Sequence, residues 1–449
     1  MYLQEKAYIL DYLFQDVLQL KINVEEIWDK SQANYVLDFG GKILEIKDSF
    51  FGNLLIDDLS YLDKKNIPEN VVWVKNPYTN DLLPGIYGEN KFVLKEGYVY
   101  CGLDIIASTF FMLTRWEEIV LPKDKHGRPL EEKMFVVKHN LYQRPIVNEY
   151  IELLRSMLIS LGISLPEVIV EFTPFVTHDV DNLFRYASFR NFCMNLAGDL
   201  LHRKSLKFFF LTCFKYVRYR LGKIKDPFDT FDELMDLSDK VGIKNAFYFI
   251  PSFSAENDAR YNIFDPRIKN IINHIEERGH EVGIHPSKNT FHNKLQFQEE
   301  MKRLYSLTSN IKGGRQHFLL YDVIDSFQNW DEGQRLEYDA GLGFYDRAGF
   351  RCGICYPYPV FDLYRRRQLG LIEKPLIVME CALLRNNTRQ YEAIYQEIVE
   401  LIDVVRKYNG WFVFLWHNDN LNRIEAAGYK FIYMEVIRYL SQKTVKSEE

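Results

Sequence analysis

Short apolar runs that end in polar residues recur through residues 166–449. They cover residues 167–181, 245–252, 280–287 and 410–419. Each run is rich in β-branched or aromatic residues, which is typical of a buried strand. Helical patterns lie between the runs, for example over residues 265–279 and 391–410. Strands that alternate with helices predict a parallel sheet with crossover connections, and therefore an α/β domain over residues 166–449.

The first 165 residues have a different pattern. Residues 91–100 alternate between apolar and polar positions, as an exposed strand does, whereas residues 104–119 place apolar side chains at helical spacing. A second helix is predicted over residues 144–162, with Pro145 near its first turn. These elements predict a smaller α+β domain over residues 1–165, which precedes the α/β domain.

Composition and charge narrow the class of protein. The chain has 449 residues, of which 47% are hydrophobic and 15% aromatic, so it is long enough for two folded domains. Lys and Arg number 56 and Asp and Glu 62, and this net charge of −6 gives no reason to expect nucleic acid as a partner. No stretch resembles a signal peptide or a membrane-spanning helix, and the six cysteines are scattered. We therefore expect a cytoplasmic protein without disulfides.

The polar residues that end the predicted strands are the candidates for chemistry, because active sites of parallel sheets lie at the carboxyl ends of the strands. Asp179 and Asp181 point to the same side of their strand, where two carboxylates repel unless a cation or a proton lies between them. His285 and His417 end two further strands, and Arg315 is a cation that could keep an aspartate ionised. Taken singly, each of these residues could equally be a cap, a core histidine or a surface salt bridge.

In this order the residues resemble the polysaccharide deacetylase family, whose members remove acetyl groups from sugars with the help of a metal ion. The resemblance covers about residues 170–425. It rests on the segments THDVD, NAFYFIPS, RGHEVGIHPSKN, RQHF and FLWH. It implies a distorted (β/α) barrel for residues 166–449. Residues 1–165 resemble the uncharacterised domain that precedes such barrels in some bacterial chains.

The resemblance also implies a role for each strand-end residue. Asp179 would be the general base, Arg315 would pair with it, and His417 would be the general acid. Asp181 and His285 would bind a divalent cation, and ligands of this kind favour Zn²⁺.

The third ligand position is where the sequence departs from the family. The family places a second histidine four residues after the first, because positions i and i+4 share one helical face. Here that position is Asn289, whose amide oxygen is a weaker ligand for zinc than imidazole. We therefore predict a weak metal site formed by Asp181, His285 and Asn289. A second departure is His317, which replaces the proline of the family's Arg-x-Pro motif.

Arg351, Tyr356 and Trp416 are the candidate substrate-binding residues. Aromatic side chains can stack on the faces of sugar rings, but packing inside the domain would account for them equally well. The predicted substrate is an acetylated sugar or glycan precursor, with an N-acetyl group preferred.

A basic, aromatic insertion lies between the first two strands of the α/β domain. Residues 182–225 contain ten Lys or Arg against one acidic residue, Asp199, and ten aromatic residues are interleaved with them. This composition suits contact with an anionic membrane face or glycolipid, here the inner face of the membrane. The alternative is a helical subdomain whose stripe LKFFFLTCFKYV is buried against the barrel.

Two other functions are compatible with the sequence. A relative that binds glycans but has lost its activity would account for the departures at Asn289 and His317. A hydrolase of the same fold that cleaves a linear, non-sugar amide is the third possibility. An enzyme is favoured because a binding protein needs neither a base nor an acid at its site.

Overall fold

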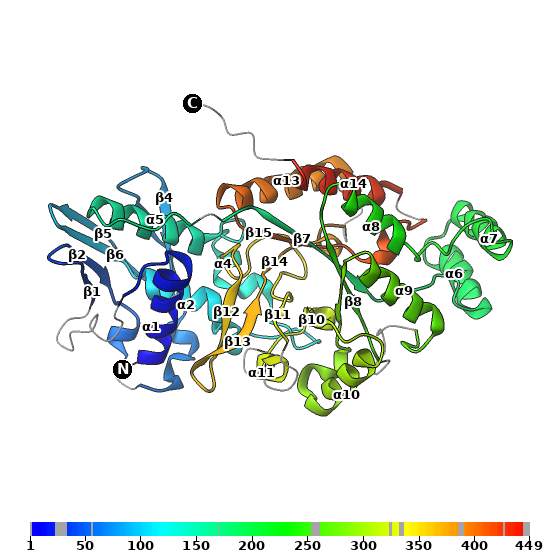
Figure 1. Cartoon of the computed structure of the whole chain (residues 1–449), viewed down its shortest axis with the longest axis horizontal. Coiled ribbons are helices and arrows are strands. Elements are labelled where there is room, and N and C mark those ends of the chain that lie inside the picture. Colours follow the sequence, from blue (N-terminus) through cyan, green and yellow to red (C-terminus); the bar gives the residue numbers. More distant parts are fainter. Residues whose placement is uncertain are drawn as a thin grey trace.

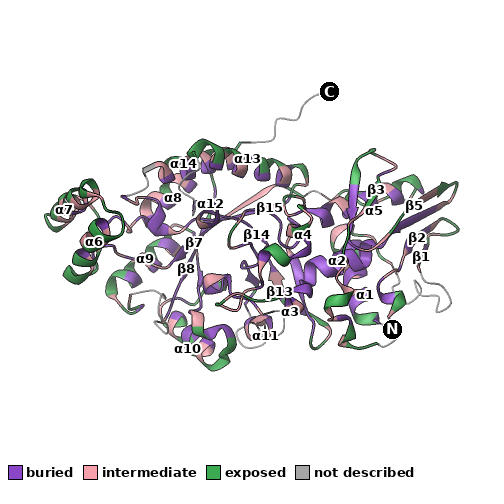
Figure 2. Cartoon of the chain, turned by 180° about the vertical axis from the view of Figure 1, so that it is seen from behind, coloured by how far each residue is buried: buried purple, intermediate pink, exposed green. Residues whose placement is uncertain are grey.

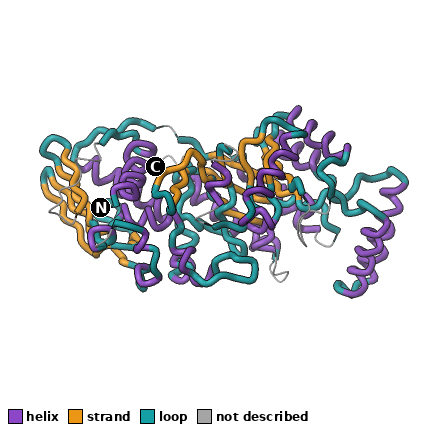
Figure 3. The backbone as a smooth tube through the Cα atoms, turned by 90° about the horizontal axis from the view of Figure 1, so that it is seen from below, coloured by secondary structure: helices purple, strands orange, loops and turns teal. Residues whose placement is uncertain are grey.

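The molecule is elongated, with an α+β region at one end, a curled sheet in the middle and a helical hairpin at the other end (Figures 1 and 3). The structure is a computed structural model. It describes residues 2–22, 34–54, 57–168, 170–252, 261–322, 326–331, 336–384, 390–424 and 427–442. In this part of the chain no helix is both long enough and apolar enough to cross a membrane.

The N-terminal region contains a four-stranded sheet. Its strands, in spatial order, are β1 (Asn34–Asp38), β2 (Ile43–Lys47), β6 (Tyr98–Leu103) and β5 (Gly88–Lys95). A two-stranded ribbon consists of β3 (Val72–Lys75) and β4 (Leu82–Gly85). The helices here are α1 (Leu3–Leu10), the π-helix η1 (Asp11–Val17), α2 (Ile105–Thr114), α3 (Glu117–Val120), α4 (Phe135–Lys138) and α5 (Ile146–Ser160).

The helix expected over residues 104–119 is divided into α2 and α3. Asp104 caps α2 by accepting a hydrogen bond from the Ala107 N–H, so the predicted start of the helix is confirmed. The helix ends at Arg115, whose φ of 57° is left-handed and breaks the helical path. This break turns the Arg115 side chain toward Glu118, with which it forms a buried ion pair.

The C-terminal region is built on a nine-stranded sheet. Its strand order is β12 (Tyr358–Asp362), β13 (Arg367–Glu373), β11 (Tyr338–Asp339), β10 (Ile311–Gly314), β9 (Glu281–Ile284), β8 (Asn245–Phe249), β7 (Thr173–Val180), β15 (Trp411–Leu415) and β14 (Leu376–Met379). Every neighbouring pair is parallel except β12 and β13. The predicted parallel α/β sheet is therefore confirmed.

The sheet is curled but open. Among the described residues β12 and β14 form its two edges and do not pair with each other, so the structure is a half-barrel, and a closed barrel is not observed. The helices around its outer side are α8 (Phe231–Asp239), α9 (Pro266–Glu277), α10 (Lys294–Tyr305), α13 (Tyr391–Lys407) and α14 (Ala427–Leu440) (Figure 1). Shorter helices are α11 (Ser326–Asp331) and α12 (Glu380–Leu384).

The outer helices are held to the sheet by apolar stripes. In α9 the buried residues are Ile268, Ile272 and Ile275, which recur at helical spacing on one face. Strand β8 is buried along its whole length, as expected for a strand covered on both sides. Apolar contacts also join the two regions of the molecule, because α2 and α1 pack against β12 and β13.

The insertion forms a helical hairpin that directly follows β7. Its helices are α6 (Phe189–Leu201) and α7 (Leu206–Arg220). The two helices contact each other and project away from the sheet (Figures 1 and 3). The alternative that its apolar stripe is buried against the sheet is wrong, because Thr212 is the one residue of α7 that is fully buried.

Candidate functional site

The curl of the sheet brings together residues from strands that are not neighbours. Strand β9 is two positions from β7, and β10 is three positions from it. In a flat sheet these separations would be about 10 and about 14 Å. Instead, side chains that follow β7, β9 and β10 lie within 4 Å of one another at the carboxyl ends of the strands.

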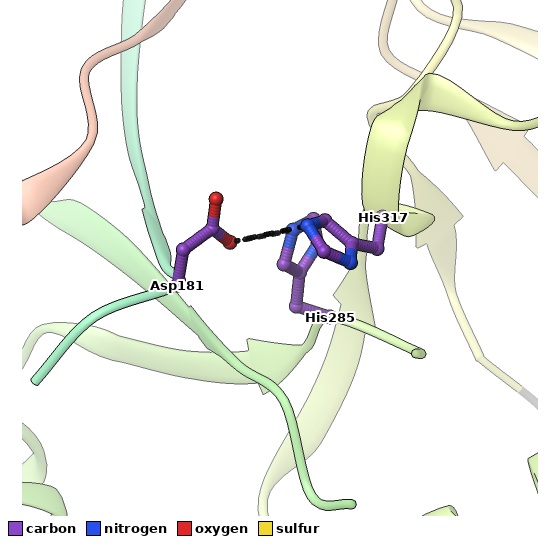
Figure 4. A group of neighbouring side chains, drawn as sticks. All are labelled: Asp181, His285 and His317. Carbon is purple, nitrogen blue, oxygen red and sulfur yellow. Dashed lines mark ion pairs between the residues drawn. The ribbon is translucent and has the colours of Figure 1, made fainter. Parts of the chain in front are cut away.

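Asp181, His285 and His317 form a compact group of potential metal ligands (Figure 4). Asp181 Oδ1 lies 3.3 Å from His285 Nε2 and 3.7 Å from His317 Nε2. Ligand atoms around a tetrahedral zinc ion, at bond lengths of about 2.1 Å, are about 3.4 Å apart. The three side chains therefore have the chemistry of a site for a divalent metal, and the two contacts of Asp181 have the spacing of neighbouring ligands.

The hydrogen bonds of the group fit a metal as well. His285 Nδ1–H donates to the backbone oxygen of Arg315 at 2.6 Å, so Nε2 is the ring nitrogen that is directed at Asp181. Asp181 Oδ1 is buried and accepts no hydrogen bond from any described residue. Burial opposes the negative charge of Asp181, but the imidazoles of His317 and His285 hold its pKa well below the usual range. The space between a buried, ionised oxygen and two imidazole nitrogens suits a cation.

Asn289, the third ligand predicted from the sequence, is exposed, whereas His285 and His317 are buried. The i and i+4 argument assumed that a helix starts at His285, but residues 285–287 are extended and the following 3₁₀-helix η7 covers Lys288–His292. Asn289 is exposed on that helix. His317, which follows β10, is the second imidazole that lies next to Asp181.

Hydrogen bonds and close strand packing hold the segments that carry His285 and His317 in place. Glu300 on α10 accepts a hydrogen bond from the Ser287 N–H at 2.8 Å and one from the Ser287 hydroxyl. The His317 N–H donates to Pro286 O at 3.2 Å. Strands β9 and β10 approach closely because a Cβ at Gly314 would collide with the oxygen of Ile284. Glycine is therefore needed immediately before Arg315.

Asp179 lies beside the ligand group and is paired with Arg315. Arg315 Nη1 donates to Asp179 Oδ1 at 2.7 Å, and both side chains are buried. The other donors of Arg315 reach Thr177 Oγ1 at 3.0 Å and Ala340 O at 2.7 Å, so its position is fully determined. Asp179 Oδ2 remains directed at His285 Nε2, 3.7 Å away. The structure thus leaves one oxygen of Asp179 facing the ligand group.

His417 approaches Asp181 from the opposite side, since it follows β15. Its Nε2 lies 3.7 Å from Asp181 Oδ2, and its Nδ1–H donates to Glu380 Oε1 at 2.7 Å. Burial opposes a positive charge on His417, but the Glu380 carboxylate raises the pKa of His417 well above its usual range. Asn420 also donates to Glu380 Oε1, at 2.7 Å. This network holds the imidazole with Nε2 toward Asp181.

The sequence analysis missed two residues of the site, Glu380 and His317. Glu380 directly follows β14, an apolar strand that ends in a polar residue as the other strands do. That pattern could have revealed it. His317 was seen only as a replacement for proline, and no local pattern distinguishes it.

The three predicted substrate-binding residues lie elsewhere. Arg351 is buried and forms an ion pair with Glu118 at 2.7 Å, so it joins the two regions of the molecule. Trp416 is fully buried beneath the site, because its side chain points to the opposite side of the strand from His417. The Tyr356 hydroxyl donates to Tyr408 O, which lies before β15 at the other end of the sheet. None of the three faces the ligand group.

A cavity of about 270 Å³ lies between the residues that follow β7 and helix α6. It starts at Asn182, the residue after Asp181, and Asn191 and Asn195 contribute further amides. Phe184 and Phe228 line it as well. Amides next to aromatic rings are groups that suit a polar ring such as a sugar.

Comparisons with known proteins match the N-terminal region to a family of unknown role. Residues 2–162 match the model of a family of unknown function (DUF7033). No curated protein matches the chain. Among solved structures, a crystal structure of a protein assigned as a polysaccharide deacetylase from Mycobacterium smegmatis is similar. Its TM-score is 0.38 and its sequence identity 12%, over 63% of this chain and 87% of that one. What this chain does is therefore inferred from its own side chains.

Proposed function

We propose that this protein is a metal-dependent hydrolase that removes an acetyl group, preferably N-linked, from a sugar or glycan precursor. The observation that carries the proposal is the pair of acid–base groups on either side of one ligand group. Asp179 is held by Arg315 on one side, and His417 is held by Glu380 on the other. The acetylated sugar is inferred from the motifs that resemble polysaccharide deacetylases.

The ligand group would hold the metal. Asp181, His285 and His317 supply one oxygen and two nitrogens, a set that suits Zn²⁺ or another divalent transition metal. A divalent cation bound there would polarise the acetyl carbonyl and acidify a water molecule.

The side chains of the protein supply the proton transfers. Arg315 donates to Oδ1 of Asp179, so Oδ2 is available to take a proton from the attacking water. Glu380 occupies Nδ1 of His417, so the proton at Nε2 can pass to the departing amine. Each such group typically contributes about 10²–10⁴-fold to the rate.

A glycan-binding protein without activity is the second candidate. It was favoured by the missing histidine at position 289, but His317 supplies a second imidazole to the ligand group. A binding site has no use for a buried Arg315–Asp179 pair and a Glu380–His417 pair aimed at the same point. These two pairs therefore support the enzyme.

Acetate release from a panel of N- and O-acetylated sugars by the zinc-loaded full chain tests the proposal. We expect Asp179→Asn and His417→Ala each to lower kcat by about 10²–10⁴-fold while zinc content stays normal. Asp181→Asn should instead lose the zinc. Asp236→Asn, an exposed carboxylate on α8, is the matched control and should change neither.

Two results would contradict the proposal. Equal loss of zinc in all three site variants would mean that the roles are misassigned. Glycan binding by the zinc-loaded chain without acetate release, for every sugar and with other divalent metals as well, would establish the binding protein instead.

A further inference from the structure

The hairpin formed by α6 and α7 exposes a continuous apolar stripe. In α7 and at the residue after it, the stripe consists of Leu206, Phe210, Phe214, Val217 and Leu221, with exposed fractions between 53% and 66%. Their spacing of three to four residues places them on one helical face, roughly opposite the buried Thr212. In α6 the exposed apolar residues include Phe189, Met194, Leu200 and Leu201. Figure 2 shows how much of the hairpin is exposed compared with the helices on the sheet.

The charges of the hairpin are almost all of one sign. Of the ten Lys and Arg in residues 182–225, eight are exposed. The single acidic residue, Asp199, is buried and bonded to Arg203 and Thr212, both at 2.7 Å. The exposed surface of the hairpin therefore carries no negative side chain, although the whole chain has a net charge of −6.

The hairpin has a core of its own, so the exposed stripe is not needed to hold its helices together. The rings of Phe192 and Tyr216 stack with centroids 3.8 Å apart. The bond between Asp199 and Thr212 joins α6 to α7. The free energy gained by burying the exposed stripe can therefore contribute to the binding of a partner.

The hairpin is also fixed relative to the candidate site. Asp226, just after the hairpin, accepts hydrogen bonds from the N–H groups of Arg185 and Tyr186, just before it, at 2.8 and 2.9 Å. Asn418, the neighbour of His417, donates to Asn182 O and to Phe228 O, both at 2.9 Å. Whatever the hairpin contacts is therefore held at a set position from the site.

We propose that the α6–α7 hairpin docks the protein on an anionic lipid surface, with the apolar stripe inserted at the headgroup level and the basic residues around it paired with lipid phosphates. Amphipathic helices that bind anionic bilayers combine an exposed apolar face with Lys and Arg. This proposal does not depend on the proposed function.

The stripe distinguishes a lipid surface from other partners. Nucleic acid would be contacted by basic and aromatic side chains, and it has no use for exposed leucine, valine and methionine. A second copy of the chain would bring another hairpin of the same strongly positive charge against the first, and like charges oppose that contact. Charge and apolar exposure together match an anionic bilayer.

The test is sedimentation of the full chain with vesicles of phosphatidylcholine, with and without phosphatidylglycerol. We expect binding to the mixed vesicles only, and weaker binding at high salt. The variant Leu206→Ser/Phe210→Ser/Phe214→Ser should lower the partition coefficient at least ~10-fold. Reversing Lys204, Lys207, Arg220 and Lys223 to Glu should lower it at least ~100-fold.

Control variants place changes of the same kind elsewhere on the surface. Leu295→Ser/Tyr364→Ser removes isolated exposed apolar side chains, and reversal of Lys133, Lys240, Lys269 and Lys302 to Glu changes the net charge equally. Both controls should bind as the unchanged chain does, and far-UV circular dichroism should be the same for all variants. The proposal fails if the unchanged chain does not bind mixed vesicles, or if both hairpin variants bind as well as the controls. It also fails if the chain is a dimer in solution that the stripe variant alone converts to a monomer.

Discussion

The sequence and the structure lead to different predictions for the third metal ligand. We expect His317→Ala to weaken zinc binding and Asn289→Ala to leave it unchanged. The reason is that His317 is buried with its Nε2 3.7 Å from Asp181 Oδ1, whereas Asn289 is exposed. For the same reason Asn289→His should not raise zinc affinity, although the sequence alone predicts that it would.

The size of the effect follows from the number of ligands. Loss of an outer partner of a metal ligand costs about 10–100-fold in affinity, so loss of one of three direct protein ligands should cost at least ~100-fold. At a zinc concentration of about 1,000 times the original Kd, zinc stabilises the fold by about 4.1 kcal/mol. After a ~100-fold loss, the same zinc concentration stabilises it by only about 1.4 kcal/mol.

Two measurements check this prediction. Competition with a chromophoric chelator gives the zinc Kd of each variant, and urea unfolding with and without zinc gives the stabilisation. Far-UV circular dichroism of the zinc-free proteins serves to show that His317→Ala is still folded. The reasoning is refuted if His317→Ala binds zinc as the unchanged chain does, or if Asn289→Ala loses as much affinity as His317→Ala.

Two further predictions concern buried carboxyl groups. Glu380→Gln should lower kcat by up to ~10²–10⁴-fold with zinc content and KM nearly unchanged, because Glu380 positions His417 through Nδ1. Glu380→Asp, which keeps the carboxylate, should retain part of the rate. A normal kcat in Glu380→Gln would exclude this role for Glu380. Burial and the nearby Asp346 raise the pKa of Glu131 to about 8. The folded chain therefore keeps a proton that the unfolded chain releases near pH 4.3, so the free energy of unfolding should fall by up to about 1.4 kcal/mol per pH unit between these values. Urea unfolding at about pH 5.5 and about pH 7.5 measures this difference in the free energy of unfolding, and Glu131→Gln should remove the contribution of Glu131 to it. The same difference in the variant and the unchanged chain would show that Glu131 is ionised in the fold.

The sequence by itself determined the elements and one side of the site. Apolar periodicity predicted β7, β8, β9 and β15 and the helices α9 and α13, because side-chain alternation and helical spacing are properties of the local backbone. The same alternation predicted that Asp179 and Asp181 share a face. It also placed His285 and His417 at the carboxyl ends of parallel strands, where the structure has them.

Only the tertiary structure decided which residues complete the site. His317 joins His285 because β9 and β10 are parallel neighbours whose carboxyl ends lie side by side, a relation that no spacing within residues 285–317 encodes. Residues 285–287 are not helical and Ser287 is held by Glu300 of α10, so the helical rule of i and i+4 does not apply to Asn289.

The tertiary structure also decided which side chains are buried and which are exposed. The sequence placed Arg351 and Trp416 at a substrate surface, yet both are covered by segments distant in the chain. Conversely, an apolar stripe in residues 206–221 is exposed although its composition would suit a core. A side chain's periodicity depends on its neighbours in sequence, whereas its exposure depends on which other segments fold over it.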